Sequence, residues 1–125
     1  MMKKLLILGM LVTSLFSEVR ELTDENFDRA TKRGLVVVEF WATWNEVNKV
    51  TVLDDWDNFD AKVYRINIDL YPKIQADNEV VILPTIIFYL DGEEAERLQG
   101  DMSFTLKVTI KELDEIVEEI LSSKF

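Results

Sequence analysis

The stretch "VVVEFWATWNEVNK", residues 36–49, carries the strongest structural signal in this chain. It belongs to a run of apolar, mostly β-branched residues, 35–40, that does not alternate with polar ones. Such a run is typical of a strand that is covered on both faces in a parallel or mixed sheet. Glu39 is an anomaly within it, since a carboxylate there would be buried. After Trp44 the apolar residues recur at helical spacing, so the stretch predicts a strand followed by a helix.

That helix would place Val47, Val50, Leu53 and Trp56 on its inner side. It would end in the acidic stretch "DDWDNFD", residues 54–60. A calcium loop there is disfavoured, because Phe59 stands where an oxygen ligand belongs and Asp60 where the turn needs glycine. The stretch is therefore interpreted as a solvated helix end, and no metal or cofactor is expected.

The sequence before this segment predicts two short elements. A weak strand is expected over residues 19–22. A helix is expected over residues 24–32, with Thr23 or Asp24 as its cap and Gly34 as its stop.

The sequence after it predicts an alternation of strands and helices. A strand is expected over residues 62–69 and a short helix over 71–77. Two further strands follow, joined at Asp91-Gly92, a dipeptide typical of tight hairpins. Thr109 and Glu112 form a capping box for a final helix. Its core face repeats at helical spacing and comprises Leu113, Ile116, Val117, Ile120 and Leu121.

Composition limits the function classes. The chain has 125 residues, a length that suits one domain, and its 48% hydrophobic and 30% charged residues are typical of a folded protein. A net charge of −10 disfavours nucleic acid and anionic membrane surfaces as partners. Cysteine and histidine are both absent. Their absence removes disulfides, thiolate chemistry and the commonest zinc ligands.

The first 17 residues have the layout of a secretory signal peptide. Lys3 and Lys4 precede an apolar run, 5–16, and a small residue, Ser17. We therefore expect a signal peptide over residues 1–17, a mature domain over 18–125, and export to a bacterial periplasm or cell envelope. Leu15 is bulky for a cleavage site, so an uncleaved anchor is the alternative. Membrane contact is expected only through such a segment.

Two segments resemble the signatures of the thioredoxin family. Residues 36–49 are similar to its strand followed by Trp-Cys-Gly-Pro-Cys-Lys, with Trp44 and Lys49 in register. Asn45 and Asn48 occupy the two cysteine positions. The stretch "LPTIIFYLDGEEAERLQG", residues 83–100, resembles the second signature, a cis-proline, a hairpin and a glycine.

The resemblance implies an α/β, thioredoxin-like fold over residues 18–125. Its central mixed sheet would have the strand order 1-3-2-4-5, with helices on both faces. Three departures from the family pattern stand out. Both cysteines are missing, the helix after Trp44 lacks the usual proline and is shorter, and "DMSFTLKV", residues 101–108, lengthens the stretch before the last helix.

The two asparagines cannot perform disulfide exchange. That reaction needs a thiolate to attack a disulfide and a second thiol to resolve the mixed disulfide, and a carboxamide supplies neither. We expect Asn45 to cap the helix by accepting a bond from the N–H of Val47 or Asn48. A buried Asn48 amide also needs a partner, and Glu39 is the candidate.

The resemblance also implies a buried polar pair. Glu39 occupies the family's buried acid position, and Arg65 lies where a basic residue neighbours that acid. We predict a Glu39–Arg65 pair on adjacent parallel strands. It would be structural, with an unrecognised catalytic acid as the alternative.

A peptide-binding groove is the last implication of the resemblance. The Leu83-Pro84 bond is predicted to be cis. The backbone of the residue before that proline would offer its N–H and C=O to an extended peptide, the strand-addition mode of recognition. Trp44, Leu83, Pro84 and Gly100 would flank the groove. Simple packing of Trp44 against the hairpin, and a purely structural role for Pro84, remain alternatives.

The sequence thus predicts an exported, redox-inactive thioredoxin-like protein that binds an extended polypeptide or a partner protein. A thiol-disulfide oxidoreductase is disfavoured because the chain has no sulfur nucleophile. A structural subunit of an envelope complex is the third hypothesis, with residues 101–108 facing the partner. Substitution of Trp44 or of Phe104 would distinguish it. Engineered replacement of the cysteines is a further alternative, but laboratory inactivation more often uses Ser or Ala, which favours natural degeneration.

Overall fold

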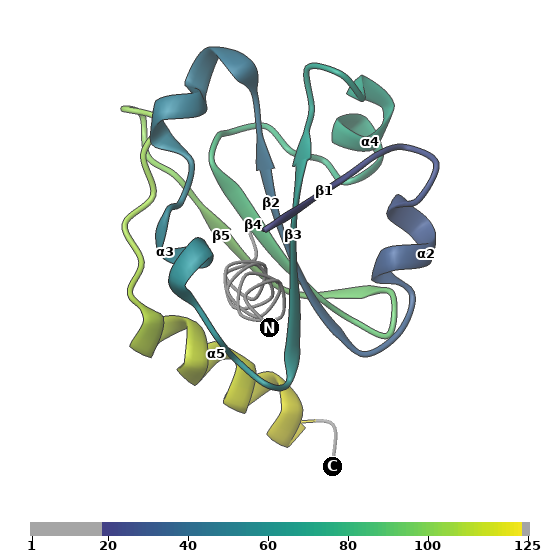
Figure 1. Cartoon of the computed structure of the whole chain (residues 1–125), viewed down its shortest axis with the longest axis vertical. Coiled ribbons are helices and arrows are strands. Elements are labelled where there is room, and N and C mark those ends of the chain that lie inside the picture. Colours follow the sequence, from purple (N-terminus) through teal and green to yellow (C-terminus); the bar gives the residue numbers. More distant parts are fainter. Residues whose placement is uncertain (1–18, 124–125) are drawn as a thin grey trace, which may run out of the picture.

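The computed structural model describes residues 19–123. These residues form a five-stranded sheet of order β1-β3-β2-β4-β5 with helices on both faces (Figure 1). The strand order and the layered α/β architecture confirm the predicted thioredoxin-like fold. The expected signal peptide, residues 1–17, lies outside the described residues.

Ten elements make up this part of the chain. They are β1 (Arg20–Leu22), α2 (Phe27–Thr31), β2 (Leu35–Trp41), the 3-10 helix η1 (Thr43–Asn48), α3 (Val52–Asp55), β3 (Ala61–Asn67), α4 (Pro72–Asp77), β4 (Thr85–Leu90), β5 (Glu93–Gln99) and α5 (Ile110–Ser123). Among them, no helix combines the length and the apolar composition that crossing a bilayer requires.

Strand β2 lies at the centre of the sheet. It pairs in parallel with β3, where Glu39 lies opposite Arg65, and antiparallel with β4, where Glu39 lies opposite Ile86. All six residues of 35–40 are buried. A strand with neighbours on both edges and helices on both faces is shielded from solvent, which explains why Glu39 is the one charged residue in its apolar run.

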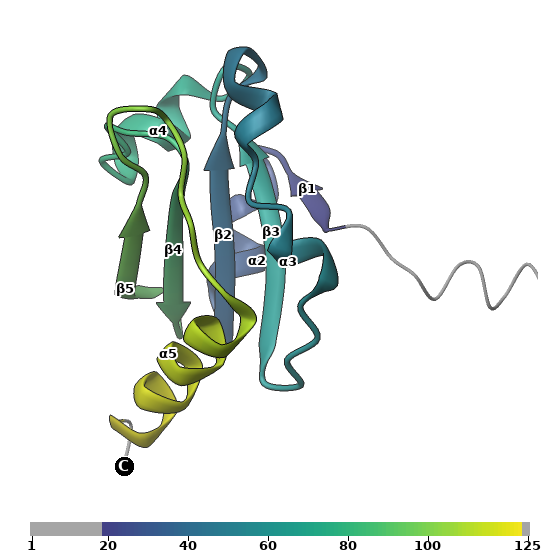
Figure 2. The same ribbon diagram turned by 90° about the vertical axis from the view of Figure 1, so that its left-hand side faces the viewer.

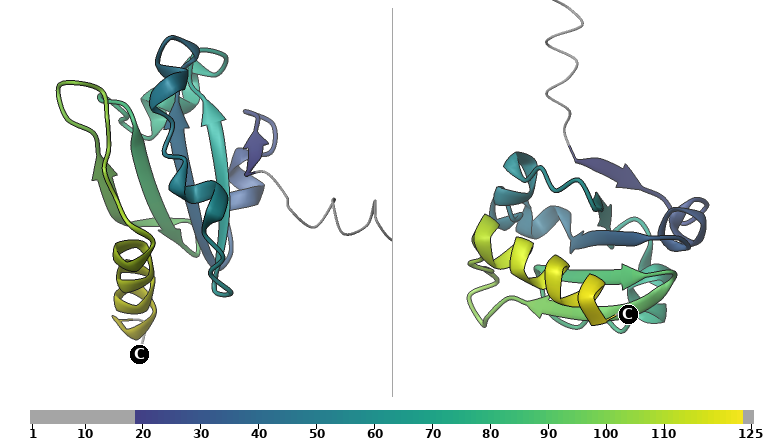
Figure 3. Two further views of the ribbon diagram at one scale, coloured as in Figure 1. Left: turned by 60° about the vertical axis from the view of Figure 1, so that its left-hand side comes forward. Right: turned by 90° about the horizontal axis from the view of Figure 1, so that it is seen from below.

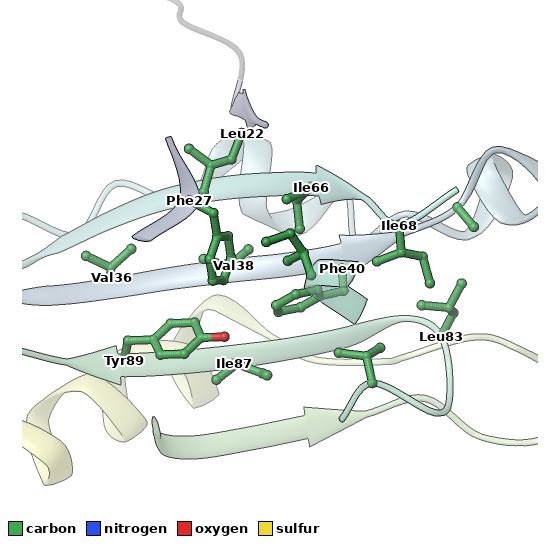
Figure 4. Packing of buried hydrophobic residues seen from close by; sticks show 13 residues of the cluster. Leu22, Phe27, Val36, Val38, Phe40, Ile66, Ile68, Leu83, Ile87 and Tyr89 are labelled. Atoms are coloured by element: carbon green, nitrogen blue, oxygen red, sulfur yellow. The ribbon is translucent and has the colours of Figure 1, made fainter. Parts of the chain in front are cut away.

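Two separate cores cover the two faces of the sheet, as the period of a strand requires. Val36, Val38 and Phe40 face helices α2 and α4 (Figure 4), and the Phe27 ring of α2 lies 6.0 Å from that of Phe40. Leu35 and Val37 face α3 and α5 on the other side. Figure 2 shows the sheet between these layers, with α5 on the near side and α2 behind. Glu39 belongs to the α3 and α5 face.

The first helix is shorter than predicted. It covers residues 27–31 rather than 24–32, and neither Thr23 nor Asp24 caps it. Instead the Thr23 N–H donates to Asn26 Oδ1 at 2.7 Å. This local bond holds the residues before Phe27 in a turn, which is the way asparagine side chains compete with helix formation.

The continuous helix predicted after Trp44 is wrong. The chain forms η1, leaves the helical conformation at Lys49 (ψ 145°), and then forms α3. The Val50 N–H donates to Glu39 Oε2 at 2.8 Å, so the buried carboxylate takes a donor that a continuous helix would use. Val50 and Leu53 are buried as expected, but Val47 is 90% exposed.

The hairpin and the final helix agree with the sequence analysis. Asp91 and Gly92 both have positive φ, 50° and 88°, as a two-residue hairpin turn requires. The capping box is present, with Glu112 N donating to Thr109 Oγ1 and Thr109 N donating to Glu112 Oε1, each at 3.1 Å.

Candidate functional site

The predicted site residues gather at one end of the sheet. Helix η1 follows β2 there, Leu83 and Pro84 precede β4, and Gly100 follows β5. The segment of residues 101–106, which we call the strap, leaves β5 at this end before the chain returns to α5 (Figure 3, left). The topology thus brings together residues that lie far apart in the sequence.

The two asparagines bind each other and the strap. Asn48 Nδ2 donates to Asn45 Oδ1 at 2.7 Å, and Asn45 Nδ2 donates to the Phe104 carbonyl at 3.1 Å. Asn45 is only 6% exposed as a result. The sequence analysis missed Phe104 as its partner, because no local pattern connects residues 59 positions apart.

Both roles expected for the asparagines are therefore wrong. Asn45 lies at a kink inside η1, with φ −117° and ψ 22°, and its Oδ1 accepts the Asn48 side-chain amide rather than the N–H of Val47 or Asn48. Asn48 does not bind Glu39. The Asn48 amide donates to Asn45 instead, and the Glu39 carboxylate accepts from Val50 and Arg65.

Trp44 packs against the same strap. Its ring meets that of Phe104 edge to face, with centroids 5.2 Å apart and an angle of 89°. Trp44 remains 61% exposed and Phe104 43% exposed. The strap thus contacts one wall of the predicted groove through both a ring and a carbonyl.

Leu83, Pro84 and Gly100 lie against one another at the same end of the sheet, and Leu83 and Pro84 are buried. The Leu83-Pro84 bond is cis, and Gly100 N donates to the Pro84 carbonyl at 2.8 Å. A Cβ on Gly100 would lie 2.8 Å from the Leu83 carbonyl oxygen, so this close approach requires glycine. Among the described residues, neither the N–H nor the C=O of Leu83 forms a hydrogen bond.

The strap has internal order of its own. Asp101 N donates to the Thr105 carbonyl, and Phe104 N donates to the Asp101 carbonyl, both at 3.0 Å. The Asp101 carboxylate accepts bonds from the hydroxyl and the N–H of Ser103. These bonds hold the pKa of Asp101 below its ordinary value. The strap is therefore a compact turn.

A second cluster surrounds Glu39 and Arg65, which the structure brings together. Arg65 Nε donates to Glu39 Oε1 at 2.8 Å, and Arg65 Nη2 donates to the Val50 carbonyl at 2.8 Å. Burial raises the pKa of Glu39, although the bond from Arg65 opposes this. Every buried side-chain polar atom of the described residues has a partner, so this cluster is fully satisfied.

Asp54 joins this cluster, and the sequence analysis missed it by assigning it to a solvated helix end. Arg65 Nη1 donates to Asp54 Oδ1 at 2.8 Å. Asp54 follows Val50 by four residues, about one helical turn. This spacing could have predicted that Asp54 lies on the same side as Val50 and therefore near Arg65.

The acidic stretch has structural partners as well. Trp56 Nε1 and Asn58 Nδ2 both donate to Asp114 Oδ1 at 2.8 Å, which ties the stretch to α5. Within residues 19–123, no group of three or more acidic side chains is placed to hold a metal ion.

Comparison with known proteins identifies the family. A sequence profile described as Thioredoxin matches residues 18–112 of this chain. The chain belongs to the thioredoxin family. The thioredoxin of Staphylococcus haemolyticus is 34% identical over 85 residues, which cover 64% of this chain and 82% of that protein. The thioredoxin of Listeria monocytogenes is 30% identical over 106 residues, which cover 81% of this chain and 97% of that protein.

Solved thioredoxin structures share the fold. A mutant thioredoxin from Halobacterium salinarum aligns with a TM-score of 0.68 at 22% identity, covering 82% of this chain and 90% of that one. A thioredoxin from Malassezia sympodialis aligns with a TM-score of 0.64 at 20% identity, covering 82% of this chain and 91% of that one.

The cysteine positions of this thioredoxin-family chain hold no thiol. The chain contains no cysteine, so no thiolate is present at residue 45, at residue 48 or elsewhere. The site holds the exposed indole of Trp44 and the backbone N–H and C=O of the buried Leu83, which have no hydrogen-bond partner among the described residues.

Proposed function

We propose that this chain is an exported, redox-inactive member of the thioredoxin family. In this proposal it binds an extended polypeptide in the groove between Trp44 and Leu83-Pro84. The observation that carries the proposal is that the N–H and C=O of Leu83, a buried residue, have no hydrogen-bond partner among the described residues, at the end of the sheet where Trp44 is exposed. An extended peptide satisfies both backbone groups by strand addition and packs a side chain on the indole.

Redox inactivity is supported by the chemistry of the site. Disulfide exchange needs a sulfur nucleophile, and the sequence has none. The side chains at the two cysteine positions are committed to hydrogen bonds with each other and with Phe104.

Export is supported by the signal-like sequence of residues 1–17. Lys3 and Lys4, the apolar run 5–16 and Ser17 fit secretion into a periplasm or cell envelope. N-terminal sequencing of the protein secreted by a bacterial host checks this, with Glu18 as the expected first residue. An intact N-terminus on cytoplasmic protein would contradict it.

Peptide binding can be tested with a displayed library of random octapeptides. Selected peptides are titrated into isotope-labelled protein and followed by NMR. We expect the Leu83 amide and the Trp44 indole signals to shift, and Trp44→Ala to weaken binding by about ten-fold or more. Val47→Ala is the matched control, because Val47 lies in the same short helix and is fully accessible. Equal affinity of the Trp44→Ala and wild-type proteins for the selected peptides would contradict peptide binding at Trp44.

A structural subunit that docks through the strap is the second candidate function. The exposure of two apolar side chains of the strap, Met102 at 92% and Phe104 at 43%, favours it, since neighbouring exposed apolar groups are typical of contact sites. In that case Met102→Ala, rather than Trp44→Ala, would weaken capture of the partner.

A further inference from the structure

The strap lies against Trp44 and Asn45, on the surface where the proposed ligand would bind. The Phe104 ring lies edge-on against Trp44, and the Phe104 carbonyl accepts the Asn45 amide. Both are contacts that a bound polypeptide would make. The described conformation therefore already holds a piece of this chain's own backbone and one aromatic side chain against one wall of the groove.

The two asparagines act together as a latch for the strap. Asn48 donates to the carboxamide oxygen of Asn45 and thereby orients the Asn45 amide nitrogen toward the strap. A carboxamide is a good donor to a backbone carbonyl, whereas a thiol is a weak one. A cysteine at position 45 would therefore donate only a weak hydrogen bond to the Phe104 carbonyl.

Phe104 adopts a conformation that other contacts must hold. Its φ is +61°, in the left-handed region that bulky residues rarely occupy. Such strain persists only where the surroundings fix it, and it recurs at switching segments. The contacts with Trp44 and Asn45 are the ones that restrain Phe104 from outside the strap.

The strap is held at both of its ends. Before it, Gly100 donates its N–H to the Pro84 carbonyl. Its last residue, Leu106, packs against the core on the α3 and α5 face. The contacts of Phe104 with helix η1 lie between these two points.

We infer that the strap is a built-in occupant of the groove, held there by the Asn45–Asn48 latch. We further infer the class of ligand: an extended polypeptide that displaces Phe104, presents its own aromatic side chain to Trp44 and offers a backbone carbonyl to Asn45 Nδ2. This inference rests on the proposed function, because it specifies which peptides the same groove binds and proposes that the strap limits their access.

The latch is tested first without any ligand. Backbone order parameters of residues 101–106 are measured by NMR relaxation for the wild type, Asn45→Ala and Met102→Ala. We expect about 0.85 for the wild type and Met102→Ala, and a fall below about 0.6 for Asn45→Ala. Met102 is the matched control because it lies in the strap and points into solvent. A mobile wild-type strap, or a rigid one in Asn45→Ala, overturns the latch.

The ligand class is tested with the strap sequence in trans. The synthetic peptide of residues 101–108, "DMSFTLKV", is titrated to several-millimolar concentration, alongside the same peptide with alanine at the position of Phe104. We expect the Phe104→Ala protein to bind the aromatic peptide about ten-fold more tightly than the wild type does, because the wild-type strap must first be displaced. The Trp44→Ala/Phe104→Ala protein should lose this binding, and the alanine peptide should not bind.

The outcomes separate this inference from the proposed function. If Phe104→Ala weakens binding of the octapeptides selected with the wild type, as Trp44→Ala does, the groove binds peptide but the strap is part of the binding surface, which refutes the inference. If no peptide shifts Leu83 or Trp44 in any variant, the groove function fails, while the order parameters still decide the latch.

Discussion

At the residue scale, Glu39 has the widest influence on the site. Its carboxylate pairs with Arg65 and accepts the Val50 N–H, so a single buried acid ends one helix and joins two strands. A buried charge is costly unless it is paired and hydrogen-bonded, and this one is both. These contacts account for the burial of Glu39 in an otherwise apolar strand.

The raised pKa of Glu39 predicts a pH dependence of stability. The pKa is higher in the folded protein than the ordinary value of 4.5, so the folded state binds this proton more tightly than the unfolded state. The contribution of Glu39 to stability is therefore fully present below pH 4.5. It is lost as the pH rises through the folded-state pKa.

Glu39→Gln removes this titration and keeps an acceptor oxygen. The free energy of unfolding of the wild type minus that of the variant should fall as the pH rises from 4 to 8. Urea unfolding of both proteins across this range measures it. A difference that stays constant, or that grows with pH, would contradict the raised pKa.

At the scale of elements, the end of one helix and the start of another are set by side-chain partners. The helical region after β2 is split because Glu39 captures the Val50 N–H. Helix α5 begins at Ile110 because the capping box satisfies two of its free backbone donors. Sequence reasoning found the second case, whose partners are three residues apart, and missed the first.

Thr109→Ala tests the capping box. We expect a loss of about 1 kcal/mol in the free energy of unfolding, because the Glu112 N–H loses its acceptor. Ser122→Ala at the exposed C-terminal end of α5 is the control and should change stability by less than about 0.5 kcal/mol. Urea denaturation measures both. Equal effects of the two substitutions would show that the cap does not stabilise α5.

At the scale of the whole molecule, the fold retains the framework of a thioredoxin while the sequence lacks the thiols. The Trp44 helix, the cis-proline loop and Gly100 converge as the family pattern implies, and the strap adds a feature of this chain. If this backbone arrangement is sufficient, cysteines at positions 45 and 48 should restore disulfide reduction. The strap should then limit access to residue 45, which is buried beneath Phe104.

Asn45→Cys/Asn48→Cys is therefore expected to catalyse insulin reduction by dithiothreitol, whereas the wild type leaves the reaction at its uncatalysed rate. Adding Phe104→Ala should raise the rate several-fold by uncovering residue 45. Turbidity of precipitating insulin measures all three proteins. Catalysis by the cysteine-free wild type would refute redox inactivity, and equal rates for the double and triple variants would refute access control by the strap.

Sequence alone determined the two-sided burial of β2, the hairpin at Asp91-Gly92 and the start of α5. These features follow from residue periodicity, from turn chemistry and from motifs whose parts lie close together, whereas the strand order came from the resemblance to the thioredoxin family. It also determined that no thiolate is available, since composition decides that directly.

Only the tertiary structure decided what the asparagines do. Asn45 contacts Phe104 across 59 positions, and Val50 contacts Glu39 across the end of β2 and the whole of η1. A carboxamide or a carboxylate accepts whichever partner the fold brings within about 3 Å, and local sequence does not specify that partner. The contacts between the strap and η1, and between Glu39 and Val50, were therefore not predictable from the sequence.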